Sequence, residues 1–375
     1  EELGISQKLM PFQASRQKGL ALELPQARQE YYTHDAWSGG ELIALNFEGV
    51  MRGVSLCRLA FNPVRYNPHR NQIKVYHRVR CRVEMRTDAG RQPIRIRPPS
   101  PEFQGLFKRV VMQEKREVKK ALEAEHPLTL VILSDTLFRK ALQPLVRWKR
   151  TKGFKVVEAY TQDQAVGKTS NDIKSYLKSL YVDAPQEGLD PPSFLLIVGD
   201  VEQVPLSQST GQITDLYYTT FDGPDDYIPD LFYGRISVAT TGQLEAVLDK
   251  LIEYEQYAFP DPSFLGESVL IAGVDASFAP RHGNGQISYA SQHYFNASFG
   301  LNAHSFLYPE SDSSGSRIVE LISSGAGFVN YTGHGLHDQW INPAFHQNDI
   351  DGLKNKGKYP LIVGNGCETN VFTLG

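Results

Sequence analysis

The sequence predicts an α/β fold in which a parallel sheet flanked by helices follows a mostly antiparallel β-sandwich. In the first hundred residues, alternating and β-rich runs are broken by proline and glycine. From residue 127 onward, short continuous apolar runs alternate with helical patterns. Continuous apolar strands joined by crossover helices are typical of a buried parallel sheet, whereas alternation is typical of antiparallel strands. We therefore expect two domains, as the length of 375 residues also favours.

Three runs predict the strands of the N-terminal domain, at residues 41–47, 54–61 and 72–76. The chain has only three cysteines, Cys57, Cys81 and Cys367, an odd and sparse set that excludes a disulfide framework. We expect Cys57 and Cys81 to be buried structural thiols, because free cysteine often behaves as a small hydrophobe. A bridge between these two cysteines is the alternative.

The boundary between the domains is predicted from a change in composition. Prolines stand at positions 93, 98, 99 and 101, and a charged run follows at residues 113–120. A proline cluster followed by a charged, solvated segment is typical of an exposed linker, where proteases cut. We assign residues 1–109 to the first domain, 110–126 to the linker and 127–375 to the α/β domain. The alternative for this linker is a solvated surface helix over residues 110–124.

The second domain is predicted from five apolar runs that alternate with five helical patterns. The expected strands are 129–133, 194–198, 269–272, 328–331 and 361–363, and the expected helices are 137–152, 170–181, 242–257, 287–299 and 316–324.

Charge and hydropathy exclude several classes of partner. The formal net charge is −3, so no overall basic field indicates a nucleic acid or an anionic membrane as partner. No apolar run of about 18 residues predicts a transmembrane segment. The first residues lack the basic-then-apolar order of a signal peptide, so an export signal, if the protein has one, is expected upstream of residue 1 or already removed.

Three of the predicted strands end in residues that carry chemistry. His334 follows the strand at 328–331 and Cys367 follows the strand at 361–363, each beside glycines, while Asp275 follows the strand at 269–272. Functional groups gather at the carboxyl ends of parallel strands. A cysteine becomes a thiolate near neutral pH beside a base, and the base needs an orienting acceptor. The backbone amides of Gly335 and Cys367 could then form an oxyanion hole. A buried core cysteine and a structural histidine are the alternatives.

A second cluster is acidic. Asp200 ends the run at 194–198, and the loop Asp222-Gly-Pro-Asp-Asp226-Tyr-Ile228-Pro-Asp230 holds four carboxylates. Clustered like charges favour a hard cation, and calcium takes several oxygen ligands, including backbone carbonyls. A solvated acidic turn is the alternative that spacing alone favours.

Several segments together resemble the gingipains, a family of secreted clan CD cysteine peptidases. The similar segments are Gly327-Phe-Val-Asn-Tyr-Thr-Gly-His-Gly, Trp340, Gly364-Asn-Gly-Cys-Glu-Thr-Asn-Val-Phe, Ile271-Ala-Gly-Val-Asp-Ala-Ser-Phe, Asp215-Leu-Tyr-Tyr, Ile287-Ser-Tyr-Ala-Ser-Gln-His-Tyr, Gln7-Lys-Leu-Met-Pro-Phe-Gln, Met51-Arg-Gly-Val and Asn62-Pro-Val-Arg-Tyr. The lysine-specific type is the most similar within the family.

The resemblance implies a caspase-like catalytic domain behind the second half of an inhibitory prodomain. It implies Cys367 as nucleophile, His334 as base and Asp275 as the acid that completes the triad. It also implies protein or peptide substrates cut after lysine, or arginine, in an enzyme at the outer surface of a Gram-negative bacterium or secreted from it. The prodomain would inhibit the enzyme, and the type IX secretion machinery would be a partner. Structural calcium is implied at Asp200, Asp222, Asp226, the Ile228 carbonyl and Asp230.

This chain departs from the family pattern in two respects. The family often has a second cysteine just before the nucleophile, where this sequence has Gly366. The family's catalytic domain also continues well beyond the position of Gly375, so the main specificity acid is expected outside this sequence. The order Leu-Phe-Lys-Arg109-Val110 resembles the end of the family's prodomain, which predicts activation by cleavage between Arg109 and Val110.

Two other functions stay open from the sequence. A sortase-like transpeptidase of the type IX secretion system shares the His and Cys motifs, but it passes the acyl group to an amine. A binding protein that keeps the peptidase fold without catalysis is the second alternative, and a buried, inert Cys367 would favour it.

Overall fold

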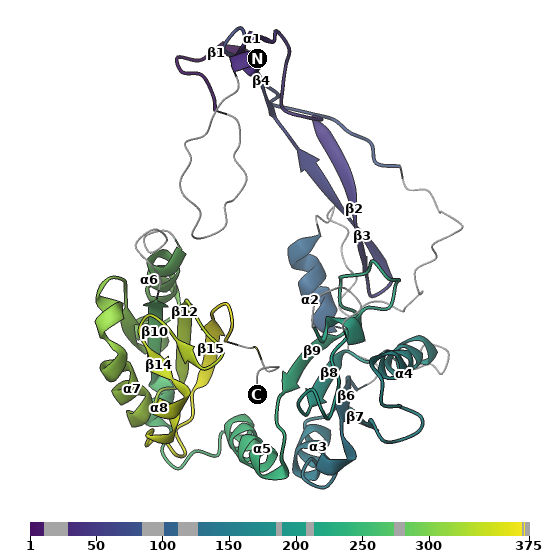
Figure 1. Cartoon of the computed structure of the whole chain (residues 1–375), viewed down its shortest axis with the longest axis vertical. Helices are drawn as coiled ribbons and strands as arrows, with labels where there is room; N and C mark the ends of the chain where they lie inside the picture. The colour runs from purple at the N-terminus through teal and green to yellow at the C-terminus, as the bar shows by residue number, and fades with distance from the viewer. Residues whose placement is uncertain are drawn as a thin grey trace. The chain divides into compact units, whose positions relative to one another are not determined.

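A computed structural model describes residues 1–10, 29–84, 101–111, 127–184, 190–207, 214–273, 282–369 and 371. The chain divides into two compact units (Figure 1). The first unit comprises Glu1–Pro99 together with Thr220–Asp230, and the second comprises Ser100–Thr219 and Leu231–Gly375. Most of the predicted linker, residues 112–126, lies outside the described residues.

The N-terminal unit contains antiparallel sheets, as expected. Strands β1 (Glu2–Gly4), β5 (Gln72–Val75) and β4 (Val64–Asn67) form one sheet, and β2 (Ile43–Met51) pairs with β3 (Val54–Phe61) in a hairpin. A short helix, α1, spans Gln29–Thr33.

Cys57 and Cys81 are exposed and free in this unit, so the expectation of buried structural thiols is wrong. Cys57 lies on β3, where Leu59 and Phe61 are also exposed. An alternating run indicates a buried face only where another layer covers the strand.

The first parallel sheet belongs to the second unit and has the strand order β7-β6-β8-β9 (Figure 1). Leu130 and Ile132 of β6 pack against Leu145 of α3 and against Leu244 and Leu248 of α5 in one apolar core. The elements are β6 (Thr129–Ser134), α3 (Gln143–Thr151), β7 (Lys155–Tyr160), α4 (Ser170–Asp183), β8 (Phe194–Val198), β9 (Phe232–Ile236) and α5 (Thr241–Gln256). Thr169 and Thr240 cap α4 and α5 in capping boxes, which fix where these helices begin.

Helix α2 (Pro101–Val110) precedes this sheet and was not expected, because the proline cluster favours a linker. Proline is well tolerated in the first turn of a helix, where its missing N–H has no helical partner to lose. Phe103 and Phe107 lie one turn apart and are both buried, and the Phe103 ring stacks on Phe232 of β9 at 4.4 Å. This apolar stripe anchors the helix to the second unit.

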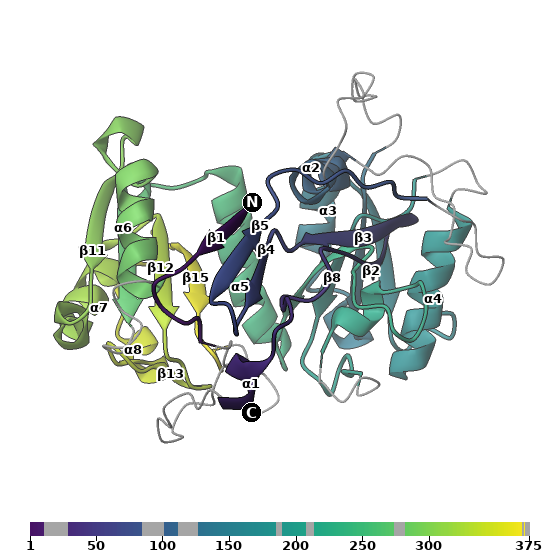
Figure 2. The ribbon, with the colours of Figure 1, turned by 90° about the horizontal axis from the view of Figure 1, so that it is seen from above.

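The second parallel sheet has the strand order β11-β10-β12-β15. Alternate residues of β10 face opposite sides: Val269 and Ile271 pack with Ile318 of α7, whereas Leu270 and Ala272 pack with Ile287 of α6. Helices therefore cover both faces of this strand (Figures 1 and 2). The elements are β10 (Glu267–Gly273), α6 (Asn284–His293), β11 (Asn302–Phe306), α7 (Gly315–Ser324), β12 (Phe328–Gly333), β13 (Gln339–Trp340), β14 (Phe345–His346), α8 (Gln347–Asp351) and β15 (Leu361–Asn365).

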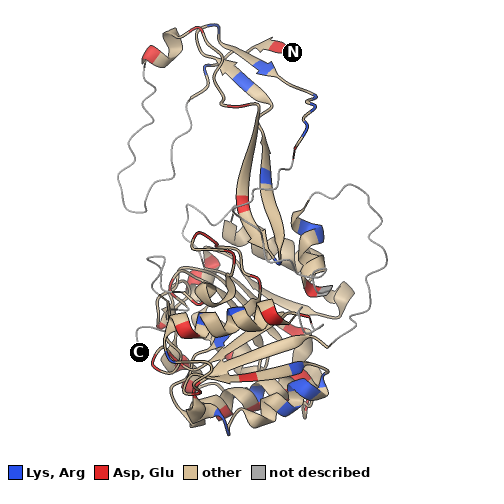
Figure 3. Cartoon of the chain, turned by 90° about the vertical axis from the view of Figure 1, so that its right-hand side faces the viewer, with Lys and Arg blue, Asp and Glu red and all other residues tan. Residues whose placement is uncertain are grey.

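Acidic and basic residues are interspersed along the helices (Figure 3). Among the described helices, none is both long and apolar enough to cross a membrane.

Candidate active site

His334 follows β12, whose alternation places Val329 and Tyr331 in the core and leaves the strand end accessible. The histidine is half-buried. Its backbone N–H donates to the carbonyl of Gly273 at 3.3 Å, and its carbonyl accepts from the N–H of Ile341 at 2.9 Å. The backbone of the proposed base is therefore fixed from both sides.

Cys367 follows β15, the strand beside β12, and its side chain is exposed. The parallel register pairs Thr332 with Asn365, so the two strands end at the same level. The segments that follow are also joined, because the N–H of Glu368 donates to the carbonyl of Gly335 at 3.4 Å. The residue after the histidine and the residue after the cysteine are thus in direct contact.

Glycines make this close approach feasible. A Cβ at Gly333 would lie 2.1 Å from the carbonyl oxygen of Gly273, and one at Gly335 would lie 2.3 Å from Cγ2 of Thr369. A Cβ at Gly366 would lie 2.9 Å from the same Cγ2 and 3.4 Å from Cα of Gly335. These glycines therefore allow the segments carrying His334 and Cys367 to lie close together.

Tyr331 and Trp340 pack together next to the backbone of His334. Their rings are stacked, parallel to within 1° and with centroids 4.4 Å apart, and Trp340 also contacts Phe345. The Tyr331 hydroxyl donates to the carbonyl of His334 at 2.6 Å, and burial raises the pKa of this tyrosine to about 12. The sequence did not single out Tyr331 as a site residue, although its period-two spacing from Val329 predicts that it points inward.

Asp275 lies outside the described residues. Its strand is described, since β10 pairs with β12 and the register places Gly273 opposite Gly333. The last residue of β10 therefore lies beside the last residue of β12, directly before His334. Gly335, expected in the oxyanion hole, is buried and forms an isolated bridge with Trp340.

The acidic loop lies in the first unit. Asp222, Asp226 and Asp230 each offer a carboxylate oxygen, and these oxygens lie within 4.8 Å of one another. Asp226 also accepts the backbone N–H groups of Asp222 and Ile228, both at 3.1 Å, so it shapes the loop. Asp200, expected as a further ligand, belongs to the second unit.

The donors of this loop fit a hard cation. Burial raises the pKa of Asp230 to about 7, an effect that the Arg52 N–H opposes and that the charges of Asp222 and Asp226 increase. A divalent cation among carboxylate oxygens offsets both their repulsion and the cost of burying them. Asp222, Asp226 and Asp230 would hold such an ion, which would tie the two ends of this loop together.

Arg109 and Val110, the predicted cleavage position, are exposed residues in the last turn of α2. A peptidase needs an extended strand of substrate, so cleavage there requires this turn to open.

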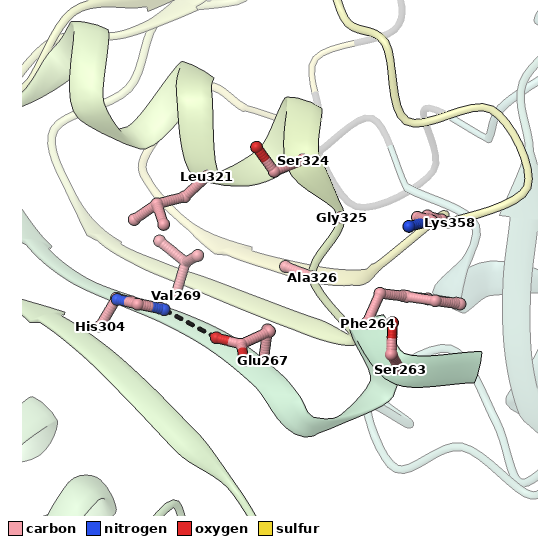
Figure 4. A pocket seen from close by; sticks show the side chains of 10 residues that line it. All are labelled: Ser263, Phe264, Glu267, Val269, His304, Leu321, Ser324, Gly325, Ala326 and Lys358. Carbon is pink, nitrogen blue, oxygen red and sulfur yellow. Dashed lines mark hydrogen bonds and ion pairs between the residues drawn. The ribbon is translucent and has the colours of Figure 1, made fainter. Parts of the chain in front are cut away.

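A cavity of about 330 Å³ lies at the other end of the second sheet (Figure 4). Glu267, the first residue of β10, contributes to its wall and accepts a hydrogen bond from Nε2 of His304 at 2.8 Å. Lys358, which precedes β15, also lines it. His334 and Cys367 follow the carboxyl ends of β12 and β15, whereas Glu267 and Lys358 lie at the amino ends of β10 and β15, so this cavity is separate from the candidate active site.

Comparison with known proteins assigns both parts of the chain. The sequence model of peptidase family C25 matches residues 123–374, and the model of the C25 propeptide matches residues 20–96. Lys-gingipain HG66 of Porphyromonas gingivalis is 32% identical over 379 residues, a match that covers 98% of this chain and 21% of that protein.

Two solved structures share the fold. One described as "Structure of Protease" has a TM-score of 0.61 and 33% identity, and the match covers 66% of this chain and 54% of that one. The crystal structure of the Arg-specific cysteine proteinase gingipain R has a TM-score of 0.58 and 23% identity, covering 68% and 57%. These matches confirm the expected caspase-like α/β fold. This chain belongs to peptidase family C25, and it joins a segment of the C25 propeptide to a segment of the C25 peptidase.

Proposed function

We propose that this chain is part of the zymogen of a secreted cysteine endopeptidase in which Cys367 is the nucleophile and His334 the base. The observation that carries the proposal is the hydrogen bond between the N–H of Glu368 and the carbonyl of Gly335. This bond joins the segments that follow β12 and β15. Cys367 and His334 therefore lie just beyond the ends of two neighbouring strands.

The reaction is acyl transfer. The Cys367 thiolate attacks the scissile carbonyl carbon, and His334 takes the thiol proton and passes it to the leaving amine. Water then attacks the thioester, and the released thiolate is regenerated. Asp275 orients the imidazole, and the N–H groups of Gly335 and Cys367 donate to the oxyanion.

The substrate class follows from the family. Lys-gingipain is 32% identical to this chain, whereas the Arg-specific gingipain R is 23% identical. We therefore assign peptide bonds after lysine as the preferred substrate, with arginine as the second choice. The propeptide acts as the inhibitor, the type IX machinery exports the protein to the cell surface or the medium, and calcium binds at the loop that holds Asp222, Asp226 and Asp230.

The position of the free Cys367 thiol, next to the strand end that His334 follows, favours an enzyme over a binding protein that merely keeps the fold. A non-catalytic relative has no need to present a free thiol beside a histidine at a strand end. All three cysteines are exposed, so accessibility alone does not identify the nucleophile. The rate at which each thiol reacts does identify it.

Alkylation with iodoacetamide at pH 6 tests the assignment in the intact protein. An imidazole beside a thiol favours the thiolate, so Cys367 should react at least about tenfold faster than Cys57 or Cys81. His334→Ala should reduce the Cys367 rate to that of the other two thiols. Equal rates for the three cysteines in the unsubstituted protein would refute the catalytic pair.

Product analysis separates hydrolysis from transpeptidation. With a lysine-containing peptide and an added amine such as glycinamide, a peptidase releases the free carboxylate as main product. A dominant amide product would instead assign the sortase-like reaction.

Activation is tested by sequencing the N-terminus of the mature enzyme. Cleavage after Arg109 predicts a mature chain that starts at Val110, and Arg109→Gln should stop it. A start between residues 114 and 121 would move the cut into the charged segment without changing the mechanism.

A further inference from the structure

Met51 and Arg52 at the tip of the β2–β3 hairpin are buried, although many residues along its two strands are exposed. Met51 is 4% and Arg52 is 2% exposed, whereas Phe47 is 54% and Leu59 is 45% exposed. Turns normally face water, because their backbone polar groups need it. Another segment of the same unit therefore covers this turn.

The covering segment is the loop Thr220–Asp230, which belongs to the peptidase part of the sequence. The backbone N–H of Arg52 donates to Oδ1 of Asp230 at 2.6 Å, and its Nη1 donates to the carbonyl of Asp230 at 3.2 Å. Both bonds are buried. Hydrogen bonds that involve a charged group are about twice as strong as neutral ones, and a low local dielectric strengthens them further.

The shapes of the tip and the loop also match. Gly49 lies at a β-bulge in β2 with φ of +146°, and a Cβ there would lie 2.8 Å from Cδ1 of Ile228. The Ile228 side chain thus packs where β2 has no side chain of its own. A side chain at position 49 would displace Ile228 from the hairpin.

The turn itself does not account for an arginine at position 52. Arg52 and Gly53 form a two-residue turn in which both have positive φ, +52° and +73°. Asparagine and glycine suit such turns, whereas a left-handed arginine costs about 1–2 kcal/mol. Residues stay in such conformations when surrounding contacts fix them. The contacts with Asp230 are what fix Arg52.

We propose that the loop Thr220–Asp230 is a docking site for the propeptide, and that Arg52 at the hairpin tip is the residue it recognises. The occupant is the propeptide of the same chain, because Arg52 donates to both the carboxylate and the backbone carbonyl of Asp230, one of three clustered carboxylates. Asp230 receives the tip, and Ile228 fits against Gly49. This contact does not depend on peptidase activity, so it goes beyond the function proposed above.

Hydrogen exchange measured by mass spectrometry tests the docking in the intact chain, with Cys367→Ala to prevent self-cleavage. Arg52→Ala should speed exchange about tenfold in peptides covering residues 49–54 and 220–230, because a buried charged contact is lost. Alanine has the same backbone strain as arginine at this φ, so the turn is otherwise unchanged. Asp230→Asn should speed exchange at residues 49–54 in return.

Arg58→Ala is the matched control, since Arg58 lies on the same hairpin in an exposed ion pair with Glu48. It should leave both regions unchanged, and β10 and β12 should exchange equally in all variants. Arg52→Lys, which keeps the charge, should give an intermediate rate. Unchanged protection of residues 220–230 in Arg52→Ala overturns the proposal, as does faster exchange throughout β10 and β12. The proposal is also overturned if exchange at residues 49–54 and 220–230 changes when calcium or chelator is added but does not change in Arg52→Ala.

Discussion

The hydroxyl of Tyr331 donates a hydrogen bond to the carbonyl of His334 at 2.6 Å, from a side chain that is fully buried under the strand end. The same carbonyl accepts from the N–H of Ile341. Two donors from different segments therefore hold the backbone of the proposed base.

Tyr331→Phe is expected to lower kcat and leave KM nearly unchanged, because the substitution loosens the base without altering substrate contacts. The carbonyl keeps its bond from Ile341, so the free energy of unfolding should fall by only about 1 kcal/mol. Steady-state kinetics and urea denaturation of the intact protein measure the two effects. Tyr257→Phe, at an exposed tyrosine, is the control and should change neither. An unchanged kcat in Tyr331→Phe would contradict the positioning role.

Gly366→Ala is expected to reduce kcat/KM at least about tenfold, because the new methyl meets Cγ2 of Thr369 and shifts the segment carrying Cys367. Thr369→Ser in the same chain removes Cγ2 and keeps the hydroxyl that donates to the Gly366 carbonyl at 3.1 Å. The double variant should therefore recover most of the activity.

Gly364→Ala provides the matched control, since the nearest atom to a Cβ there lies 3.9 Å away, which is ordinary contact. If Gly364→Ala is as harmful as Gly366→Ala, or if Thr369→Ser restores nothing, the packing explanation fails.

Calcium removal is expected to lower the melting temperature of the intact protein. A ligand that binds only the folded state at about 100 times its Kd stabilises that state by about 2.7 kcal/mol. Asp226→Asn should abolish the difference in melting temperature between excess calcium and chelator. Asp225→Asn, at an exposed residue of the same loop outside the carboxylate cluster, should preserve it. Identical melting curves with calcium and chelator, in protein known to start loaded, would exclude the site.

Glu255 on α5 gives a prediction for pH. Burial alone would raise the pKa of Glu255, but hydrogen bonds from Lys149, Lys152 and Trp148 outweigh it and hold the pKa below 4.5. A carboxyl with a lowered folded-state pKa stabilises fully above its unfolded pKa and loses this contribution as the pH falls through the folded value. Glu255→Gln should therefore cost about 1 kcal/mol at pH 7, with solvent screening already discounted.

This difference from the unsubstituted protein should stay constant down to about pH 5 and shrink below about pH 4.5. Urea denaturation at several pH values measures it. Glu320→Gln, in an exposed pair with Arg317, should show almost no difference at any pH. A gap between the Glu255 variant and the unsubstituted protein that widens in acid would refute the assignment.

In the two parallel sheets of the second unit, the sequence predicted all four interior strands but only one of the four edge strands, the apolar β15. The interior strands β6, β8, β10 and β12 are short apolar runs, because neighbours and helices cover them. Among the strands of these two sheets, the missed ones, β7, β9 and β11, lie at edges, where polar residues such as Lys155 and His304 are accommodated. An edge strand is covered less completely, so it tolerates polar residues that weaken the apolar signal.

The candidate site was predictable in part for a similar reason. His334 and Cys367 follow apolar runs beside glycines, which local sequence displays directly. The contacts of Tyr331 with His334 and of Thr369 with Gly335 depend on how separate segments pair, which no local pattern contains. Arg52 was predicted only as part of a family-like motif, since its partner Asp230 is 178 residues away in the chain.

Because of helix α2, the predicted cleavage position after Arg109 does not coincide with the boundary between the two compact units, which lies between Pro99 and Ser100. A cut after Arg109 assigns residues 101–109 to the propeptide fragment, yet Phe103 and Phe107 are buried in the second unit and Phe103 stacks on β9. Extracting two phenylalanines into water costs about 3–6 kcal/mol. The severed fragment would then leave as a slowly dissociating ligand, and the time between the cut and full activity would depend on how fast this helix detaches.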